Sequence, residues 1–175
     1  MRSRYSHPNL EYVGATWDEQ GMRIPFVKSS ITYGAAITLL LGAAAFAGSP
    51  VEPINRTGKG IAIKGYDPVA YFKQGAPLKG TPQFEQQWMG ATFLFANAEN
   101  RDLFAASPEK YAPRYGGYCA YAVSEGHTAN IDPEAWKIVD GKLYLNYSKG
   151  VQKKWEKEQE SRITRADKNW PSLHK

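Results

Sequence analysis

Residues 136–146 read WKIVDGKLYLN, and this stretch decides the fold class. Two runs rich in apolar and β-branched residues, 136–139 and 142–146, flank the dipeptide Asp140-Gly141. Asp-Gly tolerates the positive backbone φ of a type I′ turn, which is a common connection between two antiparallel strands. The stretch therefore predicts a β-hairpin.

A second hairpin is predicted over residues 83–95. Apolar side chains, Phe84 and Trp88 before the turn and Phe93 after it, alternate with polar ones at the spacing of a half-buried strand. Gly90 supplies the turn between the two runs. The chain thus contains at least two local antiparallel pairs.

Shorter elements are expected between the hairpins. Residues 61–63 (IAI) are compatible with a short first strand. Asp67 followed by Pro68 is typical of a helix start, since Asp caps orphan N–H groups and Pro fits the first helical position. Asn97 can cap a helix over residues 98–106 in the same way. Asp132 and Glu134, which flank a proline, also have the composition of a helix start.

A long C-terminal helix completes the prediction. Ser148 can cap its beginning, and Pro171 ends it. Its apolar positions recur at helical spacing; they are Val151, Trp155, Ile163, Ala166 and Trp170. Two hairpins, several short helices and this helix predict a small single domain of the α+β class.

The N-terminal part has the features of an export signal. Residues 31–47 (ITYGAAITLLLGAAAFA) carry no charge, follow Arg23 and Lys28, and end in Ala45-Phe46-Ala47. This order of basic, apolar and small residues is typical of a secretory signal peptide. The apolar run is shorter than the ~20 residues of a bilayer span. We expect cleavage after Ala47 and a periplasmic or secreted domain, whereas an uncleaved segment would anchor the domain to the membrane.

Residues 1–21 are polar and lack periodicity, and Met22 would begin a more ordinary signal peptide. Translation starting at Met22 is therefore one interpretation, and a genuine extension is the other. The predicted organisation is an extension and signal over 1–47, a linker over 48–60, one domain over 61–171 and a tail over 172–175.

Composition limits the function classes. The 175 residues are 42% hydrophobic and 22% charged, as in globular proteins, and the net charge is +5. The basic residues are spread along the chain and mixed with acidic ones, which does not favour nucleic-acid binding. Nothing after the signal is long and apolar enough for a further membrane span. The single cysteine, Cys119, cannot form an internal disulfide, so it is buried, bound to metal or joined to another molecule.

Six segments in order carry a family resemblance: 65–72 (GYDPVAYF), 90–95 (GATFLF), 100–104 (NRDLF), 107–113 (SPEKYAP), 116–120 (GGYCA) and 143–147 (LYLNY). Together they resemble exported YHS-domain proteins, over roughly residues 60–171. The resemblance implies heavy-metal binding, of copper above all. Residues 92–97 lie where shorter YHS forms carry cysteines and have none, so Cys119 is the thiol that matches the exported branch.

Soft metal ligands are few after the signal: Met89, Cys119, His127 and His174. A structural zinc site needs four ligands, whereas Cu(I) accepts few and soft ones. We therefore predict copper binding through Cys119 and His127, with Met89 joining if the first hairpin tip folds over the site. His174 falls in the expected tail. A homo-oligomer would double the ligand set, and a protein partner is a further expectation.

Two alternatives remain open. One is a non-catalytic interaction or structural module in which Cys119 is a buried thiol, since free cysteines are among the most buried residues. The other is a thiol enzyme with Cys119 as nucleophile, His127 as base and Asp132 as orienting group; the preferred interpretation is not an enzyme. Tyr115 and Tyr118 flank the glycine pair next to Cys119 and are candidates for lining a ligand pocket.

Overall fold

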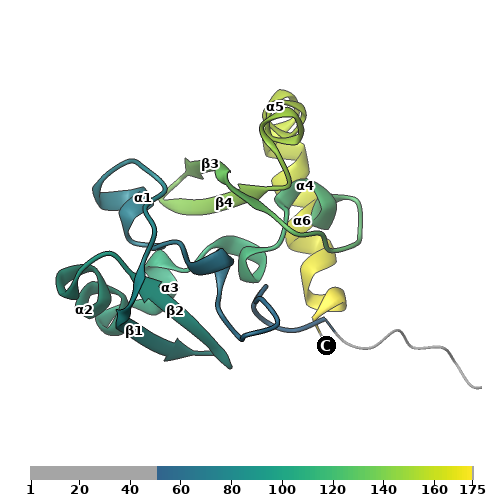
Figure 1. Cartoon of the computed structure of the whole chain (residues 1–175). Helices are drawn as coiled ribbons and strands as arrows, with labels where there is room; N and C mark the ends of the chain where they lie inside the picture. The colour runs from purple at the N-terminus through teal and green to yellow at the C-terminus, as the bar shows by residue number, and fades with distance from the viewer. Residues whose placement is uncertain (1–50, 175) are drawn as a thin grey trace, which may run out of the picture. The chain divides into compact units, whose positions relative to one another are not determined.

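The computed structural model describes residues 51–174 (Figure 1). The predicted signal over 31–47, its cleavage site and the proposed start at Met22 lie outside the described residues. Among the residues described, no helix has the length and apolar character to cross a membrane. The elements are β1 (Thr81–Trp88), β2 (Ala91–Phe95), β3 (Asp132–Val139), β4 (Lys142–Asn146), α1 (Ala70–Lys73), α2 (Ala98–Ala106), α3 (Pro108–Tyr111), α4 (Ala120–Ser124), α5 (Lys149–Lys157), α6 (Gln159–Leu173), and the 3-10 turns Ile63–Gly65 and Arg114–Gly117.

Both predicted hairpins are present, and the α+β class is confirmed. Strand β1 pairs antiparallel with β2, and β3 pairs antiparallel with β4, each as a separate two-stranded sheet. The turn residues Asp140 and Gly141 have φ values of 49° and 69°. Met89 and Gly90 occupy the equivalent turn with φ values of 46° and 75°. Positive φ at both turn positions is the type I′ geometry that matches the twist of the strands.

The helices divide between the two hairpins (Figure 1). Helix α2 lies beside the β1–β2 hairpin, α3 contacts α2 and β4, and α4, α5 and α6 lie beside β3–β4 or against one another. The predicted caps are present, because Asn97 Oδ1 accepts the N–H of Asn100 at 2.8 Å and Ser148 Oγ accepts the N–H of Val151 at 3.3 Å. The buried residues form two clusters. One joins Phe93 of β2 to Leu143 and Leu145 of β4, so it connects the two hairpins, and the other surrounds Trp155 between β4, α4, α5 and α6.

Asp67 holds the region after its helix start together. Its carboxylate is fully buried, and Oδ1 accepts the N–H groups of Val69 and Ala70. Oδ2 accepts the N–H of Ala96 at 2.9 Å and the amide of Asn100 at 2.6 Å. Four hydrogen bonds compensate for the loss of water around a buried carboxylate. Asp67 therefore caps the approach to α1, which begins three residues later at Ala70.

Two local predictions were wrong, and the long C-terminal helix is present as α6 but begins later than predicted. Residues 61–63 form isolated bridges and enter a 3-10 turn instead of a strand, because Ile63 and Lys64 have positive φ. Asp132 and Glu134 open β3, where Asp132 Oδ1 accepts the N–H of Glu134. The C-terminal helix breaks at Glu158, whose φ of −129° is not helical, so that α5 and α6 are distinct.

The chain ends also differ from the prediction. The expected linker over 48–60 contributes Ile54 to the core and buries Asn55, whose amide donates to the Gly117 carbonyl at 3.0 Å. The first residues of the expected tail are helical, because α6 continues through Pro171 to Leu173. Proline lacks only one N–H, and packing on the flanking residues compensates for that loss. Both ends consequently take part in the site described next.

Candidate functional site

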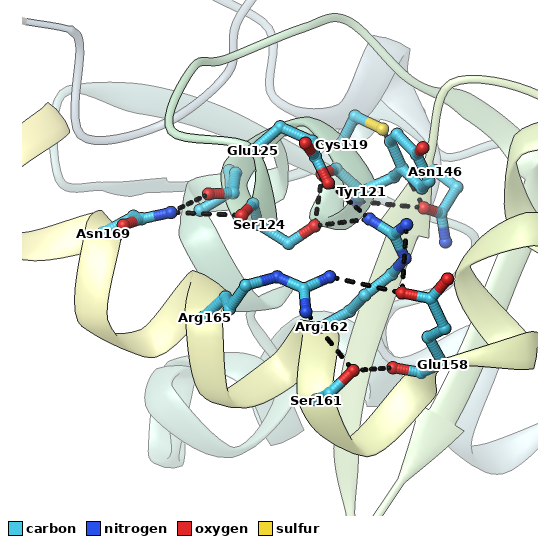
Figure 2. Close-up of polar contacts among 11 residues, drawn as sticks. Cys119, Tyr121, Ser124, Glu125, Asn146, Glu158, Ser161, Arg162, Arg165 and Asn169 are labelled. Carbon is cyan, nitrogen blue, oxygen red and sulfur yellow. Dashed lines mark hydrogen bonds and ion pairs between the residues drawn. The ribbon is translucent and has the colours of Figure 1, made fainter.

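Cys119 lies immediately before α4 and bridges to Leu145 of β4. Its side chain is 1% exposed. The thiol donates to Asn146 Oδ1 at 3.8 Å, and the sulfur accepts the N–H of Tyr147 at 3.3 Å (Figure 2 shows the Asn146 side). Both hydrogen-bonding roles of the thiol are thus filled by protein groups, as in a structural cysteine.

A buried arginine packs against α4, the helix that follows Cys119. Arg162 of α6 is 7% exposed, and its guanidinium carbon lies 3.9 Å from the centre of the Tyr121 ring. It donates to Ser124 Oγ at 3.1 Å and pairs with Glu125 at 2.7 Å and with Glu158 at 3.3 Å (Figure 2). Although burial lowers the pKa of Arg162, the bond to Glu125 and the nearby charges raise it overall. The cluster therefore locks α4 to α6.

The structure does not assemble the predicted copper site around Cys119. His127 is exposed in the loop after α4, and its described contact is a backbone N–H donated to the Ala122 carbonyl. Met89 lies at the tip of the β1–β2 hairpin and lines a pocket to which neither Cys119 nor His127 contributes. Within residues 51–174, no three or more His, Cys, Asp or Glu side chains are placed to hold a metal ion.

Met89 and His174 both line another pocket, of about 280 Å³. Its walls come from Pro53 and Ile54, from the tip of the β1–β2 hairpin, from the loop after α3 and from the end of α6. The side chains that give it its chemistry are Trp88, Met89, Arg114, Tyr115, Trp170 and His174. We call it the Met89–His174 pocket.

His174 is oriented by α6. Its ring stacks on Trp170, with centroids 4.5 Å apart and planes 11° apart, and its Nδ1 lies 2.7 Å from the Trp170 carbonyl oxygen. A carbonyl only accepts hydrogen bonds, so Nδ1 carries the proton. In the neutral ring, Nε2 then keeps its lone pair for a ligand. This role of His174 was not predicted from the sequence; the signal was the spacing of four residues between Trp170 and His174, at which side chains near a helix end are neighbours.

Met89 occupies an unfavourable place for its residue type. It takes the first position of the type I′ turn with φ 46°, where Asn, Asp and Gly are preferred. Its side chain is also 54% exposed, although it is large and apolar. Neither local propensity nor burial explains a methionine here, and such departures concentrate at functional sites.

The two predicted pocket tyrosines have different roles. Tyr115 lines the pocket, is 3% exposed, and donates its hydroxyl to Asp167 Oδ1 at 3.0 Å. Burial first, and then the Asp167 charge, raise the pKa of Tyr115 well above its usual range. Arg114 pairs with the same carboxylate at 2.9 Å. Tyr118 packs against Trp170 at 6.0 Å between centroids without being among the lining residues.

Comparison of the chain with protein-family models, with curated proteins and with solved structures found no match. The resemblance to exported YHS-domain proteins therefore stays a prediction from the sequence.

Proposed function

We propose that this chain is an exported, non-catalytic protein of the YHS type that binds a soft metal ion, Cu(I), in the Met89–His174 pocket. One observation carries the proposal: two of the few soft side chains in the sequence, distant along the chain, line the same pocket. The proposed copper site is therefore not the one expected at Cys119, and we assign Cys119 a structural role.

The donor set suits Cu(I). Thioether sulfur and imidazole nitrogen are ligands that this ion accepts, and it tolerates low coordination numbers. The Nδ1–H donated by His174 to a backbone carbonyl is the outer contact that most metal-binding histidines make, and it fixes the ring with Nε2 available. Trp88 and Trp170 add aromatic rings, whose faces attract cations.

Copper binding at Cys119 would require more rearrangement. A metal ion there would displace the thiol proton from Asn146 and would have to enter a site that is 1% exposed. The same burial argues against the thiol enzyme, which needs a nucleophile within reach of a substrate. The second candidate function, an interaction module with a buried cysteine, is favoured by these contacts of Cys119.

The test is a Cu(I) titration of the purified protein under reducing conditions, in competition with the chromophoric chelator bicinchoninate. We expect one ion per chain. Met89→Leu keeps the size of the side chain but removes the thioether sulfur that would bind the ion. His174→Phe keeps a ring that can stack on Trp170 but removes the imidazole nitrogens. Each variant should weaken binding by about tenfold or more, since one lost ligand costs at least about 1.4 kcal/mol.

Two control variants separate the sites. Cys119→Ser and His127→Gln leave the Met89–His174 pocket intact and should bind like the parent protein. Loss of binding in Cys119→Ser, with Met89→Leu unchanged, would return the copper site to the thiol. An absence of binding in the parent protein would support the interaction module instead.

A further inference from the structure

A second pocket, of about 400 Å³, shares no lining residue with the Met89–His174 pocket. It lies between the loop before the Ile63–Gly65 turn and the segment that leads into β1, with β2 behind it. Its main side chains are Thr57, Lys59, Ile61, Lys64, Lys79 and Leu94. We call it the lysine pocket.

The charges around the lysine pocket all have one sign. Lys59, Lys64 and Lys79 line it, and no Asp or Glu does. None of the three lysines forms a salt bridge to the described part of the chain. Lys79 is held in place, because its ammonium donates to the Lys64 carbonyl at 2.9 Å and lies 4.2 Å from the centre of the Tyr66 ring. Like charges gathered around a concave surface raise the local potential and attract anions.

The wall behind the lysines is apolar. Ile61 and Leu94 line it, and Gly65 lies between them, since a Cβ at Gly65 would meet both side chains at 3.5–3.6 Å. Gly80 allows close approach of the opposite wall, because a Cβ there would lie 2.3 Å from the Leu94 backbone. An apolar wall combined with a cationic rim suits a ligand that has both an apolar body and an anionic group.

The backbone at the rim is strained. Ile63 and Lys64 have φ values of 40° and 55°, a region that β-branched residues rarely adopt. The conformation is held by hydrogen bonds from Ile63 N–H to the Asn55 carbonyl and from Gly65 N–H to the Ala62 carbonyl. Lys64 consequently lines both the lysine pocket and an adjoining recess that contains Arg56 and also lacks carboxylates. Backbone strain of this kind persists where the surrounding structure imposes it, and it clusters at ligand sites.

From the charge, the apolar wall and the imposed backbone we infer that the lysine pocket binds an amphipathic organic anion, a molecule with an apolar body and one carboxylate or phosphate group. The anionic group meets the lysine ammoniums, and the apolar body covers Ile61 and Leu94. This ligand is independent of the metal, since the two pockets have no residue in common.

The test uses calorimetric titration of the purified protein with three probes below any micelle-forming concentration: decanoate, decyltrimethylammonium and acetate. They represent the whole ligand, the same apolar chain with a positive group, and the anionic group alone. We expect saturable one-to-one binding of decanoate, at least about tenfold tighter than either control probe. Decyltrimethylammonium cannot accept a charge-assisted hydrogen bond, and acetate has no chain to bury on the apolar wall, and each loss contributes a factor of this size.

Variants locate the site. Lys59→Gln combined with Lys64→Asn removes two charges, and Asn tolerates the positive φ at position 64. This double variant should weaken decanoate binding about tenfold or more. The matched control, Lys153→Gln with Lys154→Gln, removes the same charge from exposed positions of α5. It should bind decanoate like the parent protein, and so should Met89→Leu.

Three outcomes would overturn the inference. Equal binding of decanoate and decyltrimethylammonium would show that charge does not select the ligand. Equal weakening by the two double variants would reveal an effect of net charge alone. An absence of decanoate binding, with native circular dichroism retained, would exclude this ligand class directly.

Discussion

The thiol of Cys119 and the side-chain oxygen of Asn146 are 3.8 Å apart in a contact that joins the start of α4 to the end of β4. The same Asn146 oxygen accepts the N–H of Tyr121 at 3.2 Å, and the N–H of Tyr147 donates to the sulfur. Asn146 and Cys119 are both buried. Cys119, the thiol that the family resemblance singled out, is therefore part of the interior packing around the β3–β4 hairpin.

The first prediction concerns the reactivity of Cys119. In the native protein the thiol should resist labelling by a disulfide reagent such as 5,5′-dithiobis(2-nitrobenzoate), because the reagent cannot reach a side chain that is 1% exposed. In denaturant one thiol per chain should react at once. Rapid labelling of the native protein would contradict the buried structural role.

The second prediction concerns Met89. Met89→Asn should raise the free energy of unfolding by about 0.5–1 kcal/mol, because Asn accepts the left-handed turn conformation more readily. It should abolish Cu(I) binding at the same time. Chemical denaturation and the chelator titration measure the two effects. The same substitution at the other turn, Asp140→Asn, serves as the control and should leave copper binding unchanged.

The hairpins and caps were predictable because their determinants are local. Asp140-Gly141 and the Asn97 and Ser148 caps act over two to four residues, and the structure contains all three. The break at Glu158 was not predictable from apolar spacing, because the place of α6 depends on Arg162, which pairs with Glu158 within one turn and with Glu125 at the distant end of α4.

The third prediction concerns this cluster. Arg162→Ala should lower the free energy of unfolding by about 2 kcal/mol, since it removes a buried charge that holds Ser124, Glu125 and Glu158. Arg165→Ala removes a partner of Glu158 whose side chain is 44% exposed, and it should change the free energy of unfolding by less than about 0.5 kcal/mol. Urea denaturation of both variants tests the contrast, and equal losses would argue against the lock between α4 and α6.

The fourth prediction is a loss of stability at alkaline pH. Burial raises the pKa values of Tyr71 and Tyr115 well above their usual range, so the folded protein keeps protons that the unfolded chain loses near pH 10. Stability from these groups is complete below about pH 9 and falls as the pH rises further. Denaturation between pH 8 and 11 measures this decline. Tyr71→Phe and Tyr115→Phe should make it shallower, whereas Tyr147→Phe, at a residue 59% exposed, should not.

The site was only partly predictable. Met89 and Tyr115 were named from the sequence as a metal ligand and a pocket residue, and the structure places both on one pocket. His174 was assigned to a tail, because Pro171 was expected to end the helix, whereas α6 continues through it to Leu173. The pairing of a hairpin tip with the chain terminus depends on long-range packing, which the order of residues along the chain does not reveal.

The most direct test of the central claim follows the methyl group of Met89 by NMR while Cu(I) is added under reducing conditions. The chain has three methionines, Met1, Met22 and Met89, so ¹³C-methyl labelling gives few signals, and Met89→Leu assigns the one required. We expect the Met89 methyl signal to shift and to saturate at one equivalent of Cu(I), and His174→Phe to remove this response. A Met89 signal that stays in place while the protein binds copper would show that the ion binds elsewhere.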